Sequence, residues 1–244
     1  MTVLLGREKR RMSVTTERTA VKLWFIDLDD TVLRSSGGLF VALHDRMNRF
    51  LMKEFGLSEE EATEMRQRYW AQYGTTFLGL WRRHGVDPLR FLTETHDFDV
   101  RPYLHKTGDP RRALERLPGR KVLYTNAPRN YAEAALTHLR LTHVFDALVC
   151  STDTHFLGDW APKPSARMLS HLLARYRVRA AEAAMVDDSF FNLRIAKEAG
   201  LRTVCCYGHH RAHARYPMRK PAYVDRMIAQ LQDLTRTGGE RRGK

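Results

Sequence analysis

The stretch "FIDLDDTV", residues 25–32, places the carboxylates of Asp27, Asp29 and Asp30 directly after an apolar run. That run, "VKLWFIDL" at 21–28, has the length and composition of a buried strand. Carboxylates repel one another, and burying even one without a partner costs several kcal/mol, on the order of what buried ions cost in general. The sequence therefore predicts a cation at the end of this strand.

Four further apolar runs predict strands at 121–126, 147–150, 183–188 and 203–207. Between them lie segments with apolar residues at three- and four-residue spacing, which is typical of amphipathic helices, at 129–141, 164–177 and 190–200. Strands that alternate with helices predict a parallel sheet covered on both faces. We therefore expect an α/β protein with a doubly wound, Rossmann-like sheet.

The interval from Leu33 to Leu104 breaks this alternation, because about seventy residues are too many for a single crossover. It is dominated by helical patterns at 39–56 and 58–74. We interpret residues 34–104 as a helical insertion, or cap, after the first strand. The α/β core then comprises residues 21–33 and 105–234, flanked by a basic N-terminal tail, 1–20, expected to be disordered, and a basic C-terminal tail, 235–244.

The chain has 244 residues, a net charge of +13 and 41 Lys and Arg against 28 Asp and Glu. Much of the basic excess lies in "REKRR" at 7–11 and "TGGERRGK" at 237–244, and no sequence signature of the common RNA-binding modules is present. This distribution favours a solvated, Arg-rich surface over a nucleic-acid interface. Without a membrane-length apolar run or a signal-peptide pattern, we expect a cytoplasmic protein.

Polar side chains follow the predicted strands, where ligands of open parallel sheets bind. These residues are Asp27 and Asp29, Thr125 and Asn126, Lys163, and Asp187 and Asp188. The four aspartates form an oxygen-rich pocket of the kind that suits Mg²⁺ better than zinc. A Mg²⁺ ion there is the cation that the opening stretch requires, and it allows a small phosphorylated substrate to approach the carboxylates.

Four of these residues can take part directly in phosphoryl transfer. Asp27 can attack phosphorus and form an aspartyl-phosphate. Asp29 can protonate the leaving oxygen and then deprotonate the attacking water. Thr125 and Lys163 can stabilise charge on the transferring oxygens.

The motifs "DLDDT" at 27–31, "YTN" at 124–126, "PKP" at 162–164 and "VDDS" at 186–189 resemble, in order, those of the haloacid dehalogenase-like phosphatases. The resemblance implies a nucleophile at Asp27, an acid/base at Asp29 and a helical cap inserted after the first motif.

The same resemblance implies that Thr125 and Lys163 bind phosphate. It also implies a metal site formed by Asp27, the backbone carbonyl of Asp29, and Asp188 with help from Asp187. The dehalogenases of this superfamily lack the second aspartate, so its presence points to phosphate chemistry. Its ion pumps carry a different run after the nucleophile and span membranes, which excludes that class.

Within the cap, "YWAQYGTTFLGL" at 69–80 and "HDFDV" at 96–100 resemble the pyrimidine 5'-nucleotidase subfamily, which dephosphorylates UMP and CMP. This implies that Tyr73, Thr75 and Thr76 lie near the substrate. The same "YGTT" turn can also end one helix and begin the next, with Thr75 or Thr76 as its N-cap.

Two alternatives remain at this stage. One is a phosphatase for another small phosphometabolite, such as a sugar phosphate or a flavin precursor. The other is a nucleic-acid-binding protein on an inactive phosphatase scaffold, which would lack catalytic groups that this chain has.

Three further features have ordinary structural interpretations. His209 and His213 are spaced i, i+4 but lack further zinc ligands, so we expect a surface loop. The aromatic residues Trp70, Phe77, Trp81 and Phe91 are expected to pack within the cap. The three cysteines, Cys150, Cys205 and Cys206, are expected to be reduced thiols.

Overall fold

A computed structural model describes residues 20–35, 38–104, 109–208 and 219–235. The basic segments 1–19 and 236–244 and the stretch from His209 to His213 lie outside the described residues. Our expectations for those segments therefore stay predictions.

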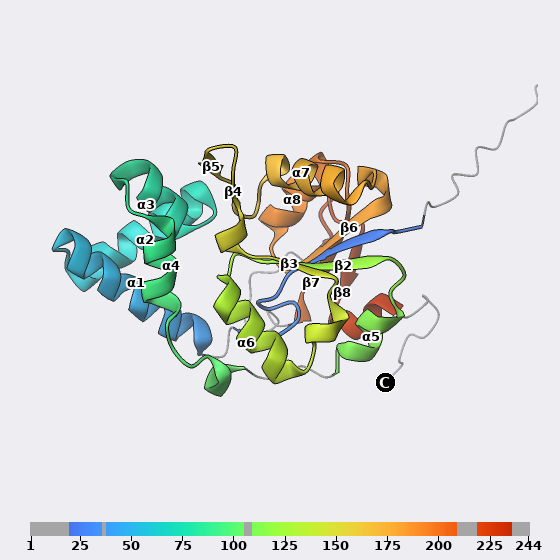
Figure 1. The fold of residues 1–244 in the computed structure, drawn as a ribbon, viewed down its shortest axis with the longest axis horizontal. Helices are drawn as coiled ribbons and strands as arrows, with labels where there is room; N and C mark the ends of the chain where they lie inside the picture. Colours follow the sequence, from blue (N-terminus) through green and yellow to red (C-terminus); the bar gives the residue numbers. More distant parts are fainter. Residues whose placement is uncertain (1–19, 36–37, 105–108, 209–218, 236–244) are drawn as a thin grey trace, which may run out of the picture.

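The core is a six-stranded sheet in the order β3-β2-β1-β6-β7-β8, and all of its paired strands are parallel. From the central first strand the chain builds outward on one side and then on the other, which confirms the doubly wound α/β fold (Figure 1). The strands are β1 (Leu23–Ile26), β2 (Arg120–Tyr124), β3 (Ala147–Val149), β6 (Ala183–Asp187), β7 (Arg202–Cys206) and β8 (Arg226–Ile228). Strand β8 was not predicted.

Helices cover both faces of this sheet because its strands are apolar on both sides. Along β1, Trp24 and Ile26 pack into one core cluster while Leu23 and Phe25 pack into the other, as the two-residue period of a strand requires. The first cluster contains residues of α5 (Arg111–Arg116) and α6 (Arg129–Leu139), and the second contains residues of α7 (Ala166–Tyr176) and α8 (Phe190–Glu198). Short 3-10 helices are η1 (Arg101–Tyr103), η2 (Thr142–Val144), η3 (Ser151–Asp153), η4 (Ala180–Glu182) and η6 (Leu231–Thr235).

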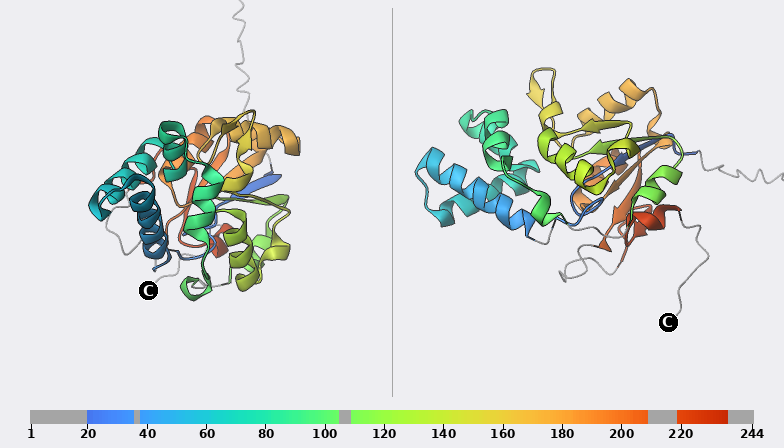
Figure 2. Two further views of the ribbon diagram at one scale, coloured as in Figure 1. Left: turned by 60° about the vertical axis from the view of Figure 1, so that its left-hand side comes forward. Right: turned by 60° about the horizontal axis from the view of Figure 1, so that its bottom comes forward.

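After the first strand the chain forms a bundle of helices beside the carboxyl ends of the strands, which we call the cap (Figures 1 and 2). It consists of α1 (Leu39–Phe55), α2 (Glu59–Tyr73), α3 (Thr76–His84) and α4 (Pro88–His96). Helix α2 begins at a capping box in which Ser58 and Glu61 exchange hydrogen bonds. Between α2 and α3 the backbone turns at Gly74, whose φ is 79°. Thr75 is the N-cap of α3, since its Oγ1 accepts a hydrogen bond from the backbone N–H of Leu78.

The cap has its own apolar core, and three of the four aromatic residues that were expected to pack there do so. Phe77 and Phe91 are buried in this core and Trp81 packs against it. The prediction that Trp70 packs there is wrong, because its side chain is 66% exposed. A hairpin that was not predicted, β4 (His155–Phe156) with β5 (Asp159–Trp160), brings Trp160 against Phe77, with ring centroids 5.9 Å apart.

The remaining expectations concern thiols and membranes. The three cysteines are buried and form no disulfide, which confirms the expectation of reduced thiols. Among the described residues, none of the helices combines the length and the apolar character needed to cross a bilayer.

Candidate active site

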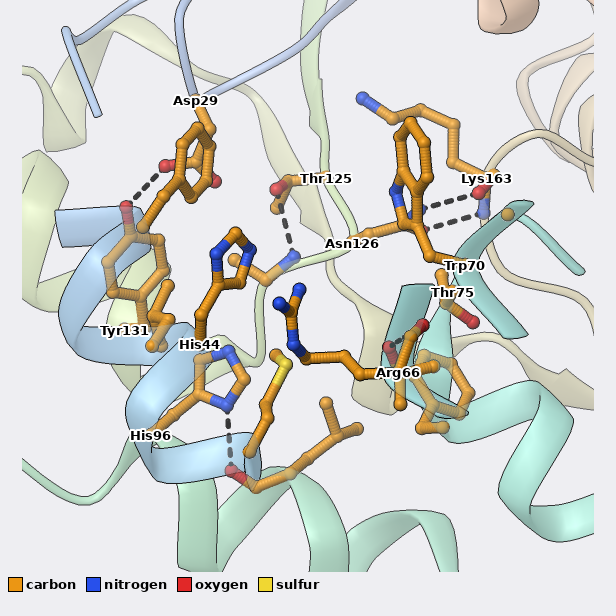
Figure 3. A pocket seen from close by; sticks show the side chains of 18 of the residues that line it. Asp29, His44, Arg66, Trp70, Thr75, His96, Thr125, Asn126, Tyr131 and Lys163 are labelled. Atoms are coloured by element: carbon orange, nitrogen blue, oxygen red, sulfur yellow. Dashed lines mark hydrogen bonds between the residues drawn. The ribbon is translucent and has the colours of Figure 1, made fainter. Parts of the chain in front are cut away.

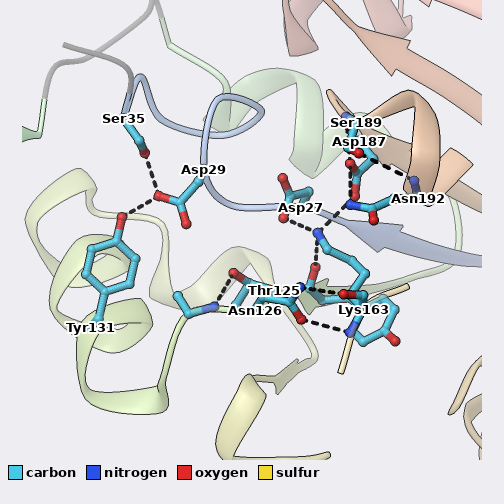
Figure 4. Close-up of polar contacts among 12 residues, drawn as sticks. Asp27, Asp29, Ser35, Thr125, Asn126, Tyr131, Lys163, Asp187, Ser189 and Asn192 are labelled. Atoms are coloured by element: carbon cyan, nitrogen blue, oxygen red, sulfur yellow. Dashed lines mark hydrogen bonds and ion pairs between the residues drawn. The ribbon is translucent and has the colours of Figure 1, made fainter. Parts of the chain in front are cut away.

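The ends of three neighbouring strands and one loop place an ammonium group among carboxylates (Figure 4). Asp27 follows β1 directly and Asp187 ends β6, while Lys163 comes from the loop after β5. The Nζ of Lys163 donates to Asp27 Oδ1, to Asp187 Oδ2 at 2.8 Å and to the carbonyl oxygen of Tyr124 at 3.1 Å. All three side chains are buried. An ammonium has three N–H donors, so this arrangement uses all of them.

Burial dominates the electrostatics of this group. It raises the pKa of Asp27 well above its ordinary value and also raises the pKa of Asp187, and the attraction of Lys163 offsets only part of the effect. Burial alone would lower the pKa of Lys163, but Asp187 and Asp27 outweigh it and the pKa is raised. Lys163 is therefore an ammonium at neutral pH, but its single positive charge does not neutralise the carboxylates around it.

The donor set fits a divalent cation. Asp27, Asp187 and Asp188 each offer one carboxylate oxygen, and these oxygens lie within 4.8 Å of one another. Three carboxylates against the single ammonium of Lys163 leave two negative charges, which one divalent ion neutralises. An all-oxygen set is what Mg²⁺ prefers. The carboxylate of Asp29 is not part of this group of described side chains. Its backbone carbonyl was expected to bind the metal, and that contribution stays a prediction.

Asp187 is held by helix α8 as well as by Lys163. Ser189 is the N-cap of α8, and its backbone N–H donates to Asp187 Oδ1 at 2.8 Å. The side-chain amide of Asn192, in the first turn, donates to the same oxygen at 2.9 Å. Sequence reasoning missed Asn192, although its place three residues after an N-cap brings it back toward the strand end.

Asp29 occupies a separate, half-buried position at the edge of the same cavity. Tyr131 and Ser35 both donate their hydroxyl hydrogens to its Oδ1 (Figure 4). Burial raises the pKa of Asp29 to about 6, although these two hydrogen bonds lower it. Sequence reasoning missed both donors; the position of Tyr131, in the first turn of the helix after the "YTN" motif, is the only signal that pointed to it.

Thr125 and Asn126, which follow β2, use their hydrogen-bonding groups in different ways. Thr125 Oγ1 accepts a hydrogen bond from the backbone N–H of Ala127 at 3.0 Å, so its own hydrogen can be donated to another acceptor. The amide of Asn126 accepts from the Lys163 backbone N–H at 2.8 Å and donates to the Lys163 carbonyl at 2.5 Å. Asn126 therefore positions Lys163 and keeps one amide hydrogen that can be donated to a substrate.

A cavity of about 790 Å³ joins these groups to the cap. From the core it is lined by Asp27, Asp29, Thr125, Asn126, Lys163 and Asp188, and from the cap by His44, Arg66, Trp70, Thr75, Thr76 and His96, among others (Figure 3). Every predicted core residue except Asp187 lines this cavity, and Asp187 lies next to it, paired with Lys163.

Two of the three predicted cap residues line the cavity and one does not. Thr75 and Thr76 line the cavity and are buried, and Thr76 Oγ1 also lies within 3.4 Å of the Arg66 carbonyl oxygen. Tyr73 does not line the cavity, and its hydroxyl accepts a hydrogen bond from Arg83 Nε at 2.7 Å. Tyr73 is therefore left out of the proposed substrate site.

Comparison with known proteins gives a sequence match over most of the chain. A family profile of haloacid dehalogenase-like hydrolases matches residues 21–200. Phosphate metabolism protein 8 of Saccharomyces cerevisiae is 25% identical over 193 residues, which cover 75% of this chain and 60% of that protein. The chain thus spans about 60% of the length of this curated relative.

Solved structures share the fold. A HAD phosphatase from Thermococcus onnurineus has a TM-score of 0.57 and 23% identity, with 88% of this chain and 96% of that chain covered. The L-2-haloacid dehalogenase from Xanthobacter autotrophicus has a TM-score of 0.53 and 15% identity over the same shares. At these identities the likeness concerns the fold alone.

Proposed function

This chain belongs to the haloacid dehalogenase-like hydrolase family, and from that premise we propose that it is a Mg²⁺-dependent phosphomonoester hydrolase with pyrimidine nucleoside monophosphates, such as UMP and CMP, as substrates. The observation that carries the proposal is the placement of two carboxyl groups with different surroundings on one cavity. Asp27 lies in the acidic cluster with Lys163, and Asp29 lies apart from it with a raised pKa.

Asp27 is the proposed nucleophile. Its carboxylate oxygen forms a bond to phosphorus while the bond from phosphorus to the leaving oxygen breaks, which leaves an aspartyl-phosphate. The ion pair with Lys163 favours the charged form of Asp27 that this attack needs. A bound Mg²⁺, held by Asp27, Asp187 and Asp188, would neutralise the carboxylates and the phosphate dianion.

Asp29 is the proposed acid and then base. It gives its proton to the leaving alkoxide oxygen in the first step. In the second step it takes a proton from the water that attacks phosphorus, which frees Asp27 and releases inorganic phosphate. A pKa of about 6 keeps both protonation states of Asp29 accessible near neutral pH. A halide leaving group needs no proton, so this second carboxyl supports phosphate chemistry over dehalogenation.

Thr125 and Lys163 complete the proposed phosphate site. The Thr125 hydroxyl can donate to a phosphoryl oxygen, and the Lys163 ammonium stabilises negative charge on the transferring oxygens. We also propose that residues 34–104 act as a substrate-selecting cap on a core formed by 21–33 and 105–234, and that the enzyme works in the cytoplasm.

Pyrimidine preference is assigned to the cap, since the strand ends recognise only a phosphoryl group and treat all nucleotides alike. The resemblance of the "YGTT" turn to the pyrimidine 5'-nucleotidases supports this, as does the place of Thr75 and Thr76 on the cavity wall. A wrong base that leaves a buried hydroxyl unpaired costs about 1–3 kcal/mol.

The test is kcat/KM for UMP, CMP, dTMP, AMP and GMP, repeated with Thr75→Ala and Thr76→Ala. We expect the three pyrimidine nucleotides to be preferred and at least one variant to weaken that preference. A flat panel, or a strong preference for sugar phosphates, would reject the pyrimidine assignment and leave the phosphatase assignment standing. Selectivity unchanged in both variants would place the determinant elsewhere in the cap.

A further inference from the structure

An aromatic ring on the cap side of the cavity has no role in the chemistry above. Trp70, near the end of α2, is 66% exposed and lines the cavity, whereas Phe77 and Phe91 of the same cap are 3% and 1% exposed. A large apolar ring gains more from packing in a core than from contact with solvent. An indole left exposed on a cavity wall is a surface on which a planar ligand can stack.

A guanidinium group lies on the same face of α2, because Arg66 precedes Trp70 by four residues. Arg66 Nε donates to Asn48 Oδ1 at 3.1 Å, and Asn48 is itself fixed by a 2.7 Å hydrogen bond from its Nδ2 to Thr63 Oγ1. These bonds hold the arginine at its Nε. Figure 3 shows its terminal nitrogens reaching into the cavity between His44 and Trp70.

The terminal nitrogens of Arg66 keep donors available for a ligand. Within the described ranges, none of the carboxylates lies close enough to Arg66 to form an ion pair with it. Arg66 is half-buried, so it has already lost part of its hydration; this burial lowers its pKa, although Asp45 raises it. Partly dehydrated donors aimed into a cavity gain most from an acceptor that arrives with a ligand.

We propose that Trp70 and Arg66 form a base-recognition site, in which the indole stacks on the pyrimidine ring and the guanidinium donates to the carbonyl oxygen next to the glycosidic nitrogen. Uracil, thymine and cytosine all carry that carbonyl, and adenine carries none. Guanine carries its carbonyl elsewhere on the ring, so the site takes planar rings whose carbonyl lies next to the glycosidic nitrogen. This inference rests on the proposed function and adds the residues that would select its substrates.

The test compares Arg66→Met and Trp70→Ala with the unmodified protein, using UMP and the base-free substrate ribose 5-phosphate. We expect kcat/KM for UMP to fall about tenfold or more in each variant, as lost charged hydrogen bonds and lost base stacking typically cost. The value for ribose 5-phosphate should stay within about twofold, because the core groups are untouched. In Arg66→Met the preference for UMP over AMP should fall as well.

Matched variants control for indirect effects. Arg68→Met removes a guanidinium from an exposed residue of the same helix that does not line the cavity, and it should leave both substrates unchanged. Trp70→Phe keeps an aromatic surface and should recover part of the UMP activity. Thermal unfolding midpoints of all variants would show whether any loss comes from misfolding.

The possible failures are distinguishable. If the unmodified protein prefers UMP and Arg66→Met and Trp70→Ala keep that preference, the base-recognition site is wrong and the proposed function stands. Equal losses with UMP and ribose 5-phosphate would also overturn the site. If the unmodified protein hydrolyses none of these phosphomonoesters, the proposed function itself fails.

Discussion

Lys163 and Tyr131 show how single side chains separate two carboxyl groups that are only two residues apart in the chain. The ammonium of Lys163 pairs with Asp27, whereas hydroxyl hydrogens of Tyr131 and Ser35 reach Asp29. One carboxyl is therefore placed among charges and the other among neutral donors. Their surroundings support different proposed roles, one as nucleophile and one as proton carrier.

The two aspartates should respond differently to the leaving group. Asp27→Asn removes the proposed nucleophile and should abolish turnover of every substrate. Asp29→Asn should still transfer the phosphoryl group from p-nitrophenyl phosphate, because nitrophenolate departs without a proton, but should lose alkyl phosphates such as UMP by about 10²-fold or more. Steady-state and burst kinetics with both substrates measure this. Equal losses with good and poor leaving groups would count against Asp29 as the acid.

His96 should make the stability of the fold depend on pH. Its side chain is buried on the cavity wall, and burial lowers its pKa from 6.5 to about 4, although a hydrogen bond to the Leu92 carbonyl opposes the shift. His96 takes up a proton near pH 6.5 in the unfolded chain and only near pH 4 in the folded chain. The folded state is therefore most stable, as far as His96 is concerned, above pH 6.5, and it loses stability as the pH falls from 6.5 to 4.

Urea unfolding at pH 7.5 and pH 5.0 measures the effect of His96. Between pH 6.5 and 5 the folded state should lose about 2 kcal/mol, at about 1.4 kcal/mol per pH unit. His96→Gln, which cannot titrate, should show a smaller difference between the two pH values. The same difference in both proteins would mean that other groups cause the pH dependence.

At the scale of elements, the cap depends on a close approach between α2 and α3. A Cβ placed on Gly79 would lie 2.4 Å from Cγ of Tyr69, whose buried ring also hydrogen-bonds to His84 at 2.6 Å. Glycine thus lets the two helices meet at this point. The αL turn at Gly74 and the N-cap at Thr75 set the direction in which α3 leaves α2.

Gly79→Ala should therefore destabilise the protein, although alanine is favoured over glycine in a helix by about 1 kcal/mol. We expect a loss of about 1–3 kcal/mol in the free energy of unfolding, as overpacked sites show. Urea denaturation measures it. In a Tyr69→Ala background the same change should be neutral or stabilising, since the ring is gone. An equal loss in both backgrounds would show that the contact with Tyr69 is not the cause.

The sequence patterns predicted five of the six strands of the main sheet and located the two long cap helices closely. The patterns at 39–56 and 58–74 became α1 and α2 within one or two residues at each end. Strand β8 and the β4–β5 hairpin, with three and two residues per strand, were missed. Such short segments carry too few residues for a periodic pattern, and only pairing with a neighbour makes them strands.

Across the whole molecule, the strand-end residues could be predicted because parallel topology brings them to one edge of the sheet. The cap side of the cavity could not. Trp70, which was expected to pack in the cap, lines the cavity, and Tyr73 packs against the cap core. Which way each side chain points depends on how four helices pack. Side chains such as Arg66 line the cavity only because the cap lies over the strand ends, which no local pattern encodes.

The acidic cluster at the centre of the molecule should make activity depend on a metal ion. The two negative charges that Lys163 leaves uncompensated repel a phosphate dianion unless a divalent cation is present. Hydrolysis of p-nitrophenyl phosphate should cease with excess EDTA and return when Mg²⁺ is added beyond the chelator. Full activity in thoroughly chelated enzyme would contradict the proposed requirement for a metal ion.

The proposed covalent intermediate on Asp27 is the central claim, and trapping it is the most direct test. Asp29→Asn enzyme would be mixed with p-nitrophenyl phosphate and Mg²⁺, quenched in acid within the first turnover, reduced with borohydride and mapped by peptide mass spectrometry. We predict about one phosphoryl group per chain on Asp27, converted by the reduction to homoserine at position 27. Nitrophenolate release from protein that carries no phosphoryl group, or a phosphoryl group on another residue, would contradict it.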